Sequence, residues 1–209
     1  MLETAILALT TFFATIGSLD VAAMFAVLTV TYTAKQKLTV AIRGTLIATT
    51  ILVTFALIGE LLLTSLGISL AALRIAGGIL LLLIGIDMVF ARSSGGTSTT
   101  SEEEEEAFSK SDISVFPLAT PLIAGPGAMG AVILLIANQQ GDVTGQAIII
   151  ASLLTILLVT FICLLLAVKL QNLLGVTGLH VIARVMGVLL SALAVQFIID
   201  GIKQSGLLM

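Results

Sequence analysis

Charged residues are scarce in this chain of 209 residues: Asp, Glu, Lys and Arg together make up 10% of it. A soluble domain carries about 25% charged residues, which keep its surface in water. Hydrophobic residues account for 58% of the chain, and its mean hydropathy is +1.23. Uncharged apolar runs long enough to cross a bilayer recur along the whole sequence. We therefore predict an integral membrane protein rather than a soluble protein with an unusually apolar core.

Residues for covalent and metal chemistry are also rare. Cys163 is the single cysteine, which excludes an intramolecular disulfide and argues against a thiolate metal site. The sequence has no HExxH motif, no P-loop and no Ser/His/Asp set. The single histidine, His180, is expected in a cytoplasmic loop as an interfacial residue, with proton transfer as the alternative. We expect no enzyme, no metal site and no organic cofactor.

Six apolar runs predict transmembrane helices, since each offers the roughly 20 residues that a helix needs to cross about 30 Å of hydrocarbon. Their approximate limits are 4–32, 41–64, 70–91, 112–138, 145–169 and 178–203. The alternation typical of barrel strands is absent, so we predict an all-α polytopic protein. The first run follows no basic segment, and we interpret it as a span and not as a cleaved signal.

The basic residues predict the orientation. The connections after the first, third and fifth spans contain Lys35, Lys37, Arg92, Lys110 and Lys169. The opposite side has little beyond Arg74 and Lys203. By the positive-inside rule, the first group lies in the cytoplasm and both termini lie outside.

One long polar segment, Arg92 to Asp112, divides the chain. It is rich in Gly, Ser and Thr and contains Glu102–Glu106, which hold five of the twelve acidic residues. Such a composition cannot bury enough apolar surface to fold. We therefore divide the chain into a first half at 1–92, a disordered acidic cytoplasmic linker at 93–111 and a second half at 112–209. A partner-binding role for the linker is the alternative. The remaining residues are close to neutral overall, so nothing points to nucleic acid.

The two halves resemble each other. An offset of 110 residues aligns Thr10, Gly17, Arg74 and Gly77 with Thr120, Gly127, Arg184 and Gly187. With three spans per half, the second copy would enter the membrane from the opposite side. This predicts two inverted-topology repeats, an architecture common among secondary transporters. Chance similarity between apolar helices is the alternative.

The first span of each half has a feature that should interrupt it. In the second half Pro126 cannot donate an N–H and should end the helix near Ala124, while Gly125 and Gly127 allow unusual backbone conformations. Proline also favours the first position of a new helix. The N–H groups of Gly127, Ala128 and Met129 would then form an anion site at the bilayer midplane.

In the first half Gly17 loosens the helix, and Ser18 is a candidate N-cap. Asp20 would fall in the first turn of the following half-helix, near the middle of the span, where a charge should face the protein interior. Amides from one interruption and a carboxylate from the other suit a zwitterion, and Thr120 is a further candidate contact. Small neighbouring residues leave space for a small neutral amino acid. The alternative is a pair of kinks used only for packing.

Four other ionisable residues fall within the predicted helices: Glu60, Arg74, Asp87 and Arg184. Glu60 could pair with Arg74 across a short loop, whereas Asp87 is too far along the helix from Arg74 to pair with it. We expect the arginines to be snorkelling or structural. Gate pairs that form and break during alternating access are the other interpretation.

Two long stretches, 28–92 and "PLATPLIAGPGAMGAVILL" (117–135), resemble the MarC family, also called the small neutral amino-acid transporter (SnatA-like) family. The resemblance implies six spans in the inner membrane, two inverted repeats and transport of glycine, alanine and similar amino acids, linked to an H⁺ or Na⁺ gradient in some members. The family motif carries over at Gly125, Pro126 and Gly127. In the family, the first motif usually resembles Asp/Asn-Pro-x-Gly-x-x-Pro. Here the corresponding stretch is "GSLDVAA" (17–23), which lacks both prolines of that motif and has Asp20 where the family tends to have Gly.

Two other hypotheses fit the same spans. One is a channel or exporter of unrelated solutes or ions. The other is a membrane scaffold whose acidic linker recruits a partner. Transport direction, coupling ion and oligomeric state are left open by the sequence.

Overall fold

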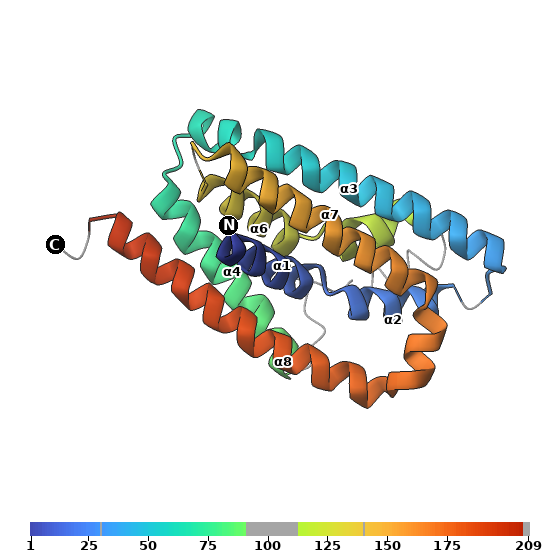
Figure 1. The fold of residues 1–209 in the computed structure, drawn as a ribbon. Coiled ribbons are helices and arrows are strands. Elements are labelled where there is room, and N and C mark those ends of the chain that lie inside the picture. Colours follow the sequence, from blue (N-terminus) through green and yellow to red (C-terminus); the bar gives the residue numbers. More distant parts are fainter. Residues whose placement is uncertain (30, 91–112, 140, 207–209) are drawn as a thin grey trace.

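A computed structural model describes residues 1–29, 31–90, 113–139 and 141–206, and every regular element among them is helical (Figure 1). The helices are α1 (Leu2–Ile16), α2 (Ser18–Leu28), α3 (Ala34–Ser65), α4 (Leu70–Phe90), η1 (Ser114–Ile123), α6 (Pro126–Ala137), α7 (Val143–Leu165) and α8 (Ala167–Gln204). Five spans are long and apolar enough to cross a bilayer, or six if the bent pair η1–α6 counts as one. The predicted all-α polytopic class is confirmed. The predicted linker at 93–111 lies outside the described residues.

The prediction of a loop around His180 was wrong. Helix α8 continues from Ala167 to Gln204 through this segment. Glycines at 175 and 178 each cost only about 1 kcal/mol in a helix, and the segment has no proline, so the flanking apolar residues extend the helix across it. In Figure 1 the first turns of α8 lie across one end of the molecule before the helix turns to run along α4.

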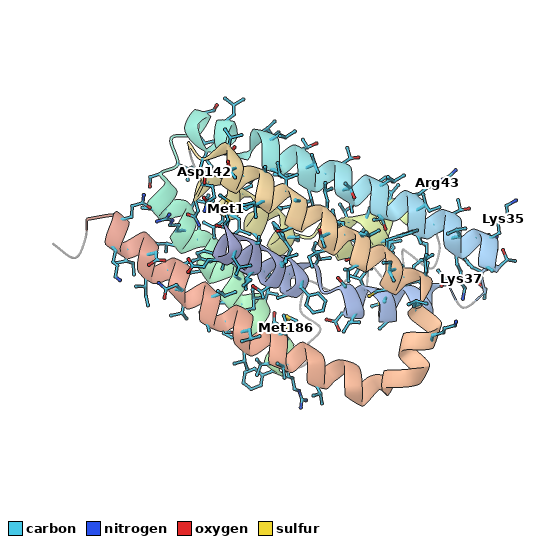
Figure 2. All side chains as sticks on the ribbon, in the orientation of Figure 1. Met1, Lys35, Lys37, Arg43, Asp142 and Met186 are labelled. Atoms are coloured by element: carbon cyan, nitrogen blue, oxygen red, sulfur yellow. The ribbon has the colours of Figure 1, made fainter. Side chains whose placement is uncertain are left out.

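The connections gather at two opposite ends of the molecule. The α3–α4 connection, the α6–α7 connection and the end of α8 lie at the left in Figure 1, whereas the α2–α3 and α7–α8 connections lie at the right. In Figure 2, Lys35, Lys37 and Arg43 all lie at the right end, and Asp142 lies at the left. Three basic residues therefore lie together at one end of the long axis.

Helices α4 and α8 form a close antiparallel pair through a seam of small residues. The seam repeats every seven residues and comprises Ala71, Gly78 and Gly85 on α4 and Gly187, Ala194 and Gly201 on α8. A Cβ atom built on Gly85 would lie 2.9 Å from the carbonyl oxygen of Gly187. One built on Gly78 would lie 2.8 Å from that of Ala194. Small residues allow backbones to approach in this way, and they provide the packing that holds membrane helices together.

The core of the bundle is formed largely by the shorter helical segments. Eight of the twelve residues of α6 are buried, and α1 buries its second half from Thr11 to Ile16 except for Phe13. The longer helices have many exposed leucines instead, such as Leu57 (68% exposed) on α3 and Leu158 (59%) on α7. Apolar side chains directed outward are the normal surface of a protein solvated by lipid. The shorter helices thus contribute much of the buried core, and the longer helices much of the outer surface.

Candidate functional site

The segment between η1 and α6 leaves the helical conformation at two residues. Helix η1 ends at Ile123, Ala124 has φ −95° and ψ 62°, and Gly125 is extended with φ −80° and ψ 170°. Helix α6 then begins with Pro126 at its first position, and the two helices are bent by 53°. Proline at this position loses no helical hydrogen bond, which is why a new helix can begin there.

The first backbone hydrogen bond of α6 joins the N–H of Met129 to the carbonyl oxygen of Gly125 at 3.0 Å. Met129 was therefore wrongly included among the free donors. The N–H groups of Gly127 and Ala128 precede this bond, and neither has a backbone acceptor among the described residues. Two amides are thus left at the positive end of the α6 dipole.

These amides are covered in this conformation. Gly125, Gly127 and Ala128 are buried, whereas Pro126 is exposed. The side chain of Ile84 on α4 lies against Gly127, where a Cβ atom would overlap its Cδ1. Both residues that carry the free amides are therefore covered in this conformation, with Ile84 packed against Gly127.

Thr120 lies within η1 at a residue with extended backbone angles, φ −133° and ψ 130°. It is partly buried, and its hydroxyl donates a long hydrogen bond of 3.4 Å to the carbonyl oxygen of Val115. This bond is weak enough to be exchanged for one to a ligand.

The chain between α1 and α2 turns at a single residue. Gly17 has φ 62° and ψ 50°, the left-handed conformation that glycine adopts without steric cost. Its N–H donates to the carbonyl oxygen of Phe13 at 3.1 Å, and its own carbonyl oxygen accepts from Val21 at 2.9 Å. Gly17 therefore ends α1 and begins α2, so the prediction that Ser18 is the N-cap was wrong.

Ser18 instead joins α2 to α7. Its Oγ lies 2.8 Å from the Oγ1 of Thr160, and both side chains are fully buried. Thr160 donates its one hydroxyl hydrogen to the carbonyl oxygen of Ile156 at 2.8 Å. The hydroxyl of Ser18 must therefore donate to the Oγ1 of Thr160, so the Ser18 oxygen is not the acceptor in this pair.

Asp20 is in the first turn of α2, where the helix dipole stabilises a carboxylate. Its side chain is exposed, so the prediction that this charge faces the protein interior was wrong. Its Oδ2 lies 3.5 Å from the point at which a Cβ atom of Gly17 would stand. The carboxylate thus lies close to the turn at Gly17.

The two interruptions lie side by side. Helix α1 contacts α6, and α2 contacts η1. The helix before the turn at Gly17 thus contacts the helix after the turn at Gly125, and the helix after Gly17 contacts the helix before Gly125. The segments α1–α2 and η1–α6 therefore run in opposite directions, and their turns lie at similar positions along the long axis. The turns at Gly17 and Gly125 therefore belong to one region of the bundle, where Gly127 and Ala128 are buried and the side chain of Asp20 is exposed.

Of the four predicted gating residues, Arg74 has the most informative contacts. Its Nε donates to Oδ1 of Asn138 at 2.6 Å, and an Nη donates to Oε1 of Gln204 at 2.8 Å. These bonds join the start of α4 to the ends of α6 and α8. Neither amide partner was predicted from the sequence, although Asn138 directly follows the apolar run of α6, where a polar side chain reaches water or binds a neighbour.

The other gating candidates are not gathered around Arg74. Asp87 is partly buried near the other end of α4, and Arg184 is exposed on α8. Glu60 lies within α3, but its side chain is outside the described part of the structure. In the described residues no three His, Cys, Asp or Glu side chains are grouped so as to hold a metal ion.

The sequence matches the profile of the "MarC family integral membrane protein" over residues 2–205. It is 38% identical to the UPF0056 membrane protein MJ1677 of Methanocaldococcus jannaschii, with 95% of each chain covered. It is 33% identical to the UPF0056 membrane protein YvbG of Bacillus subtilis, covering 86% of this chain and 85% of the relative. No solved structure matches it significantly. The resemblance noted in the sequence is confirmed by these similarities.

Proposed function

This chain belongs to the MarC family of integral membrane proteins, and from that premise we propose that it is a secondary transporter of small neutral amino acids that works by alternating access. The proposal is based on the two adjacent interruptions in the helices. At the first turn of α6 the amides of Gly127 and Ala128 are free, and in the first turn of α2 lies the carboxylate of Asp20. Backbone left without partners inside a membrane is costly unless it lines a cavity or binds a ligand.

The chemistry of the two interruptions fits a zwitterion. The N–H groups of Gly127 and Ala128, supported by the α6 dipole, would bind the carboxylate of the substrate. Asp20 and the last carbonyl groups of α1 would bind its ammonium group. The side chains at both interruptions are small, so the site favours glycine and alanine, and Thr120 would contribute a hydroxyl.

The relative directions of the helices support an inverted repeat. Pairing of α1 with α6 and of α2 with η1 is what two copies in opposite orientation would produce, and α4 and α8, the last helices of the two halves, pack antiparallel. Each interruption would then lie near the bilayer midplane, where inverted-repeat transporters bind their substrates. The positive end with Lys35, Lys37 and Arg43 would face the cytoplasm, which places both termini outside in the inner membrane.

Alternating access requires contacts that exist in one state and not in the other. The covering of Gly127 by Ile84 and the bonds from Arg74 to Asn138 and Gln204 suit this role. Arg74 holds the end of α6 that would face outward, so the described conformation would be closed on that side. Since its partners are neutral amides, these bonds can break at modest cost.

The test is uptake of radiolabelled amino acids into proteoliposomes, with Na⁺ and H⁺ gradients imposed separately. We expect saturable uptake and counterflow of glycine and alanine, and a lower apparent affinity in Asp20→Asn. Asp142→Asn is the matched control, because Asp142 caps α7 at one end of the molecule, away from both interruptions. Ion conductance without saturation would support a channel instead. Uptake no greater than in empty liposomes would contradict the proposal.

A further inference from the structure

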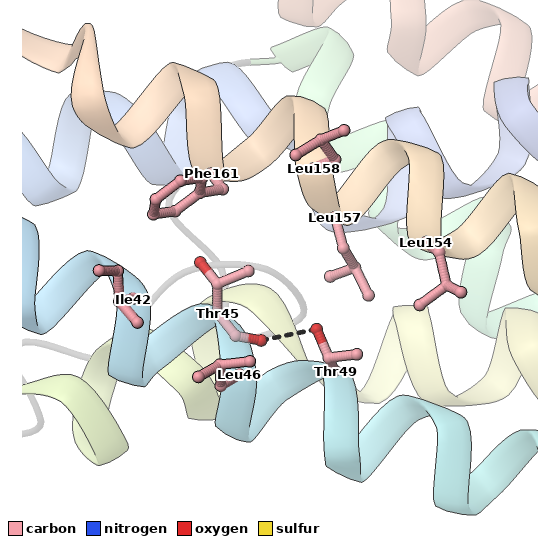
Figure 3. A pocket seen from close by; sticks show the side chains of 8 residues that line it. All are labelled: Ile42, Thr45, Leu46, Thr49, Leu154, Leu157, Leu158 and Phe161. Carbon is pink, nitrogen blue, oxygen red and sulfur yellow. Dashed lines mark hydrogen bonds between the residues drawn. The ribbon is translucent and has the colours of Figure 1, made fainter.

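A groove on the outer surface separates α3 from α7. Figure 3 shows its lining, with Ile42, Leu46 and Thr49 on α3 facing Leu154, Leu158 and Phe161 on α7. The cavity has a volume of about 320 Å³. Leu46 is 61% exposed and Leu158 is 59% exposed, so the groove opens to the surroundings of the protein. In a membrane protein those surroundings are lipid.

The groove continues toward the basic end of the molecule. A second cavity of about 150 Å³ lies where α3 and α7 meet α2 and the start of α8, and its lining includes Leu38 and Leu164. Leu38 is one turn from Ile42, and Leu164 is one turn from Phe161, so the second cavity lies one turn further along both helices, toward the basic end. From Thr49 to Lys37, the helical rise gives a length of about 18 Å.

Lys37 lies at the end of this groove. Its partly buried side chain lines the second cavity together with Thr29 of the α2–α3 connection. Among the described residues, none accepts a hydrogen bond or forms an ion pair with its ammonium group. Lys37 is at the end of the molecule where Lys35 and Arg43 also lie (Figure 2). A positive charge thus stands where an apolar groove meets the membrane surface.

We propose that this groove binds one anionic glycerophospholipid, with its phosphate at Lys37 and one acyl chain along α3 and α7. The length of about 18 Å from Thr49 to Lys37 fits this ligand. An acyl chain spans the roughly 15 Å of hydrocarbon in one leaflet, and the glycerol accounts for the remaining distance to the phosphate. The charge fits as well, since basic pockets between membrane helices bind anionic head groups. An acyl chain is slender enough for a groove of this volume, and the lipid phosphate supplies a counter-charge for Lys37.

The experiment uses the absence of tryptophan from the chain. Leu46→Trp places a single fluorophore at the groove, and Leu83→Trp places one at a position on α4 that is 54% exposed and outside the groove. Each protein is reconstituted in vesicles with brominated phosphatidylglycerol or brominated phosphatidylcholine. The quenching of fluorescence then gives the relative association constant of each lipid at that tryptophan.

We expect about fivefold preference for the anionic lipid at position 46, since one lysine near an anionic lipid contributes about 1 kcal/mol. Leu83→Trp should show little preference. Adding Lys37→Gln to Leu46→Trp should remove the preference, whereas adding Lys35→Gln should leave most of it, because Lys35 lines a different cavity.

Three results would overturn the proposal. The first is equal quenching by the two lipids at position 46. The second is an equal loss of preference in Lys35→Gln and Lys37→Gln, which would indicate general surface charge. The third is protection of position 46 from both lipids, which would mean that a protein surface covers the groove. Amino-acid transport enters none of these measurements, so the result is independent of the proposed function.

Discussion

Replacing Ser18 and Thr160 should reveal an asymmetry in the stability of the protein. Thr160 donates to Ile156, and Ser18 donates to Thr160. Ser18→Ala removes a donor but leaves Thr160 with its bond to Ile156, so only one interhelical hydrogen bond is lost. In membrane proteins such a bond contributes about 0.6 kcal/mol.

Thr160→Val has a larger expected effect. It removes the acceptor and leaves the Ser18 hydroxyl buried without a partner, which costs about 1–3 kcal/mol. In the double variant neither hydroxyl remains, so its destabilisation should be smaller than the sum of the two single effects by about 1 kcal/mol. Ser18→Ala should therefore be the least destabilising substitution, and Thr160→Val should lower the free energy of unfolding as much as the double variant or more.

The assay is reversible unfolding in mixed micelles with increasing SDS, followed by circular dichroism for all four proteins. Equal free-energy changes for the two single variants, or strictly additive changes in the double variant, would refute the assigned direction of the hydrogen bond.

Three further predictions concern other helix contacts. Gly85→Ala should destabilise the protein by about 1–3 kcal/mol in the same unfolding assay. Gly130→Ala is the control and should stabilise the protein by about 0.5–1 kcal/mol, because a Cβ atom at Gly130 meets nothing within 4 Å. Equal effects of the two substitutions would mean that the α4–α8 seam is not close-packed. Gly127→Ala should also be destabilising, and Ile84→Val should relieve the effect because it deletes the Cδ1 atom that a Cβ would overlap; no relief would place the clash elsewhere. Asn138→Asp would give the Arg74 guanidinium a charged partner and strengthen this contact by up to about 1 kcal/mol. Uptake should then slow by about two- to fivefold at unchanged KM. Faster uptake would contradict a role for this contact in closure.

Composition and local rules predicted the helical class well. Long apolar runs in lipid form helices, and proline favours the first position of a helix, so the start of α6 at Pro126 could be predicted from the sequence. The same rules failed at His180, because glycine weakens a helix without stopping it when the neighbouring residues are strongly apolar.

The site could be predicted only in outline. The residue types at Gly17 and Gly125 indicate where the chain departs from a helix, but they do not show which amide or hydroxyl is satisfied. Ser18 illustrates the limit: serine before a helix is a common N-cap, yet here the partner is Thr160, more than a hundred residues away. Such contacts depend on the packing of α2 against α7, which no local pattern contains.

The central claim is that backbone amides at the start of α6 bind the carboxylate of a small amino acid. Replacing Ala128 by lactic acid, through nonsense suppression, removes its N–H and keeps its side chain. The same replacement at Ala131 is the control, because that amide lies inside the helix. For glycine uptake into proteoliposomes we predict that KM rises at least about tenfold for position 128, as expected for a lost hydrogen bond to a charged group, and stays near the original value for position 131. An unchanged KM at position 128 would contradict the account.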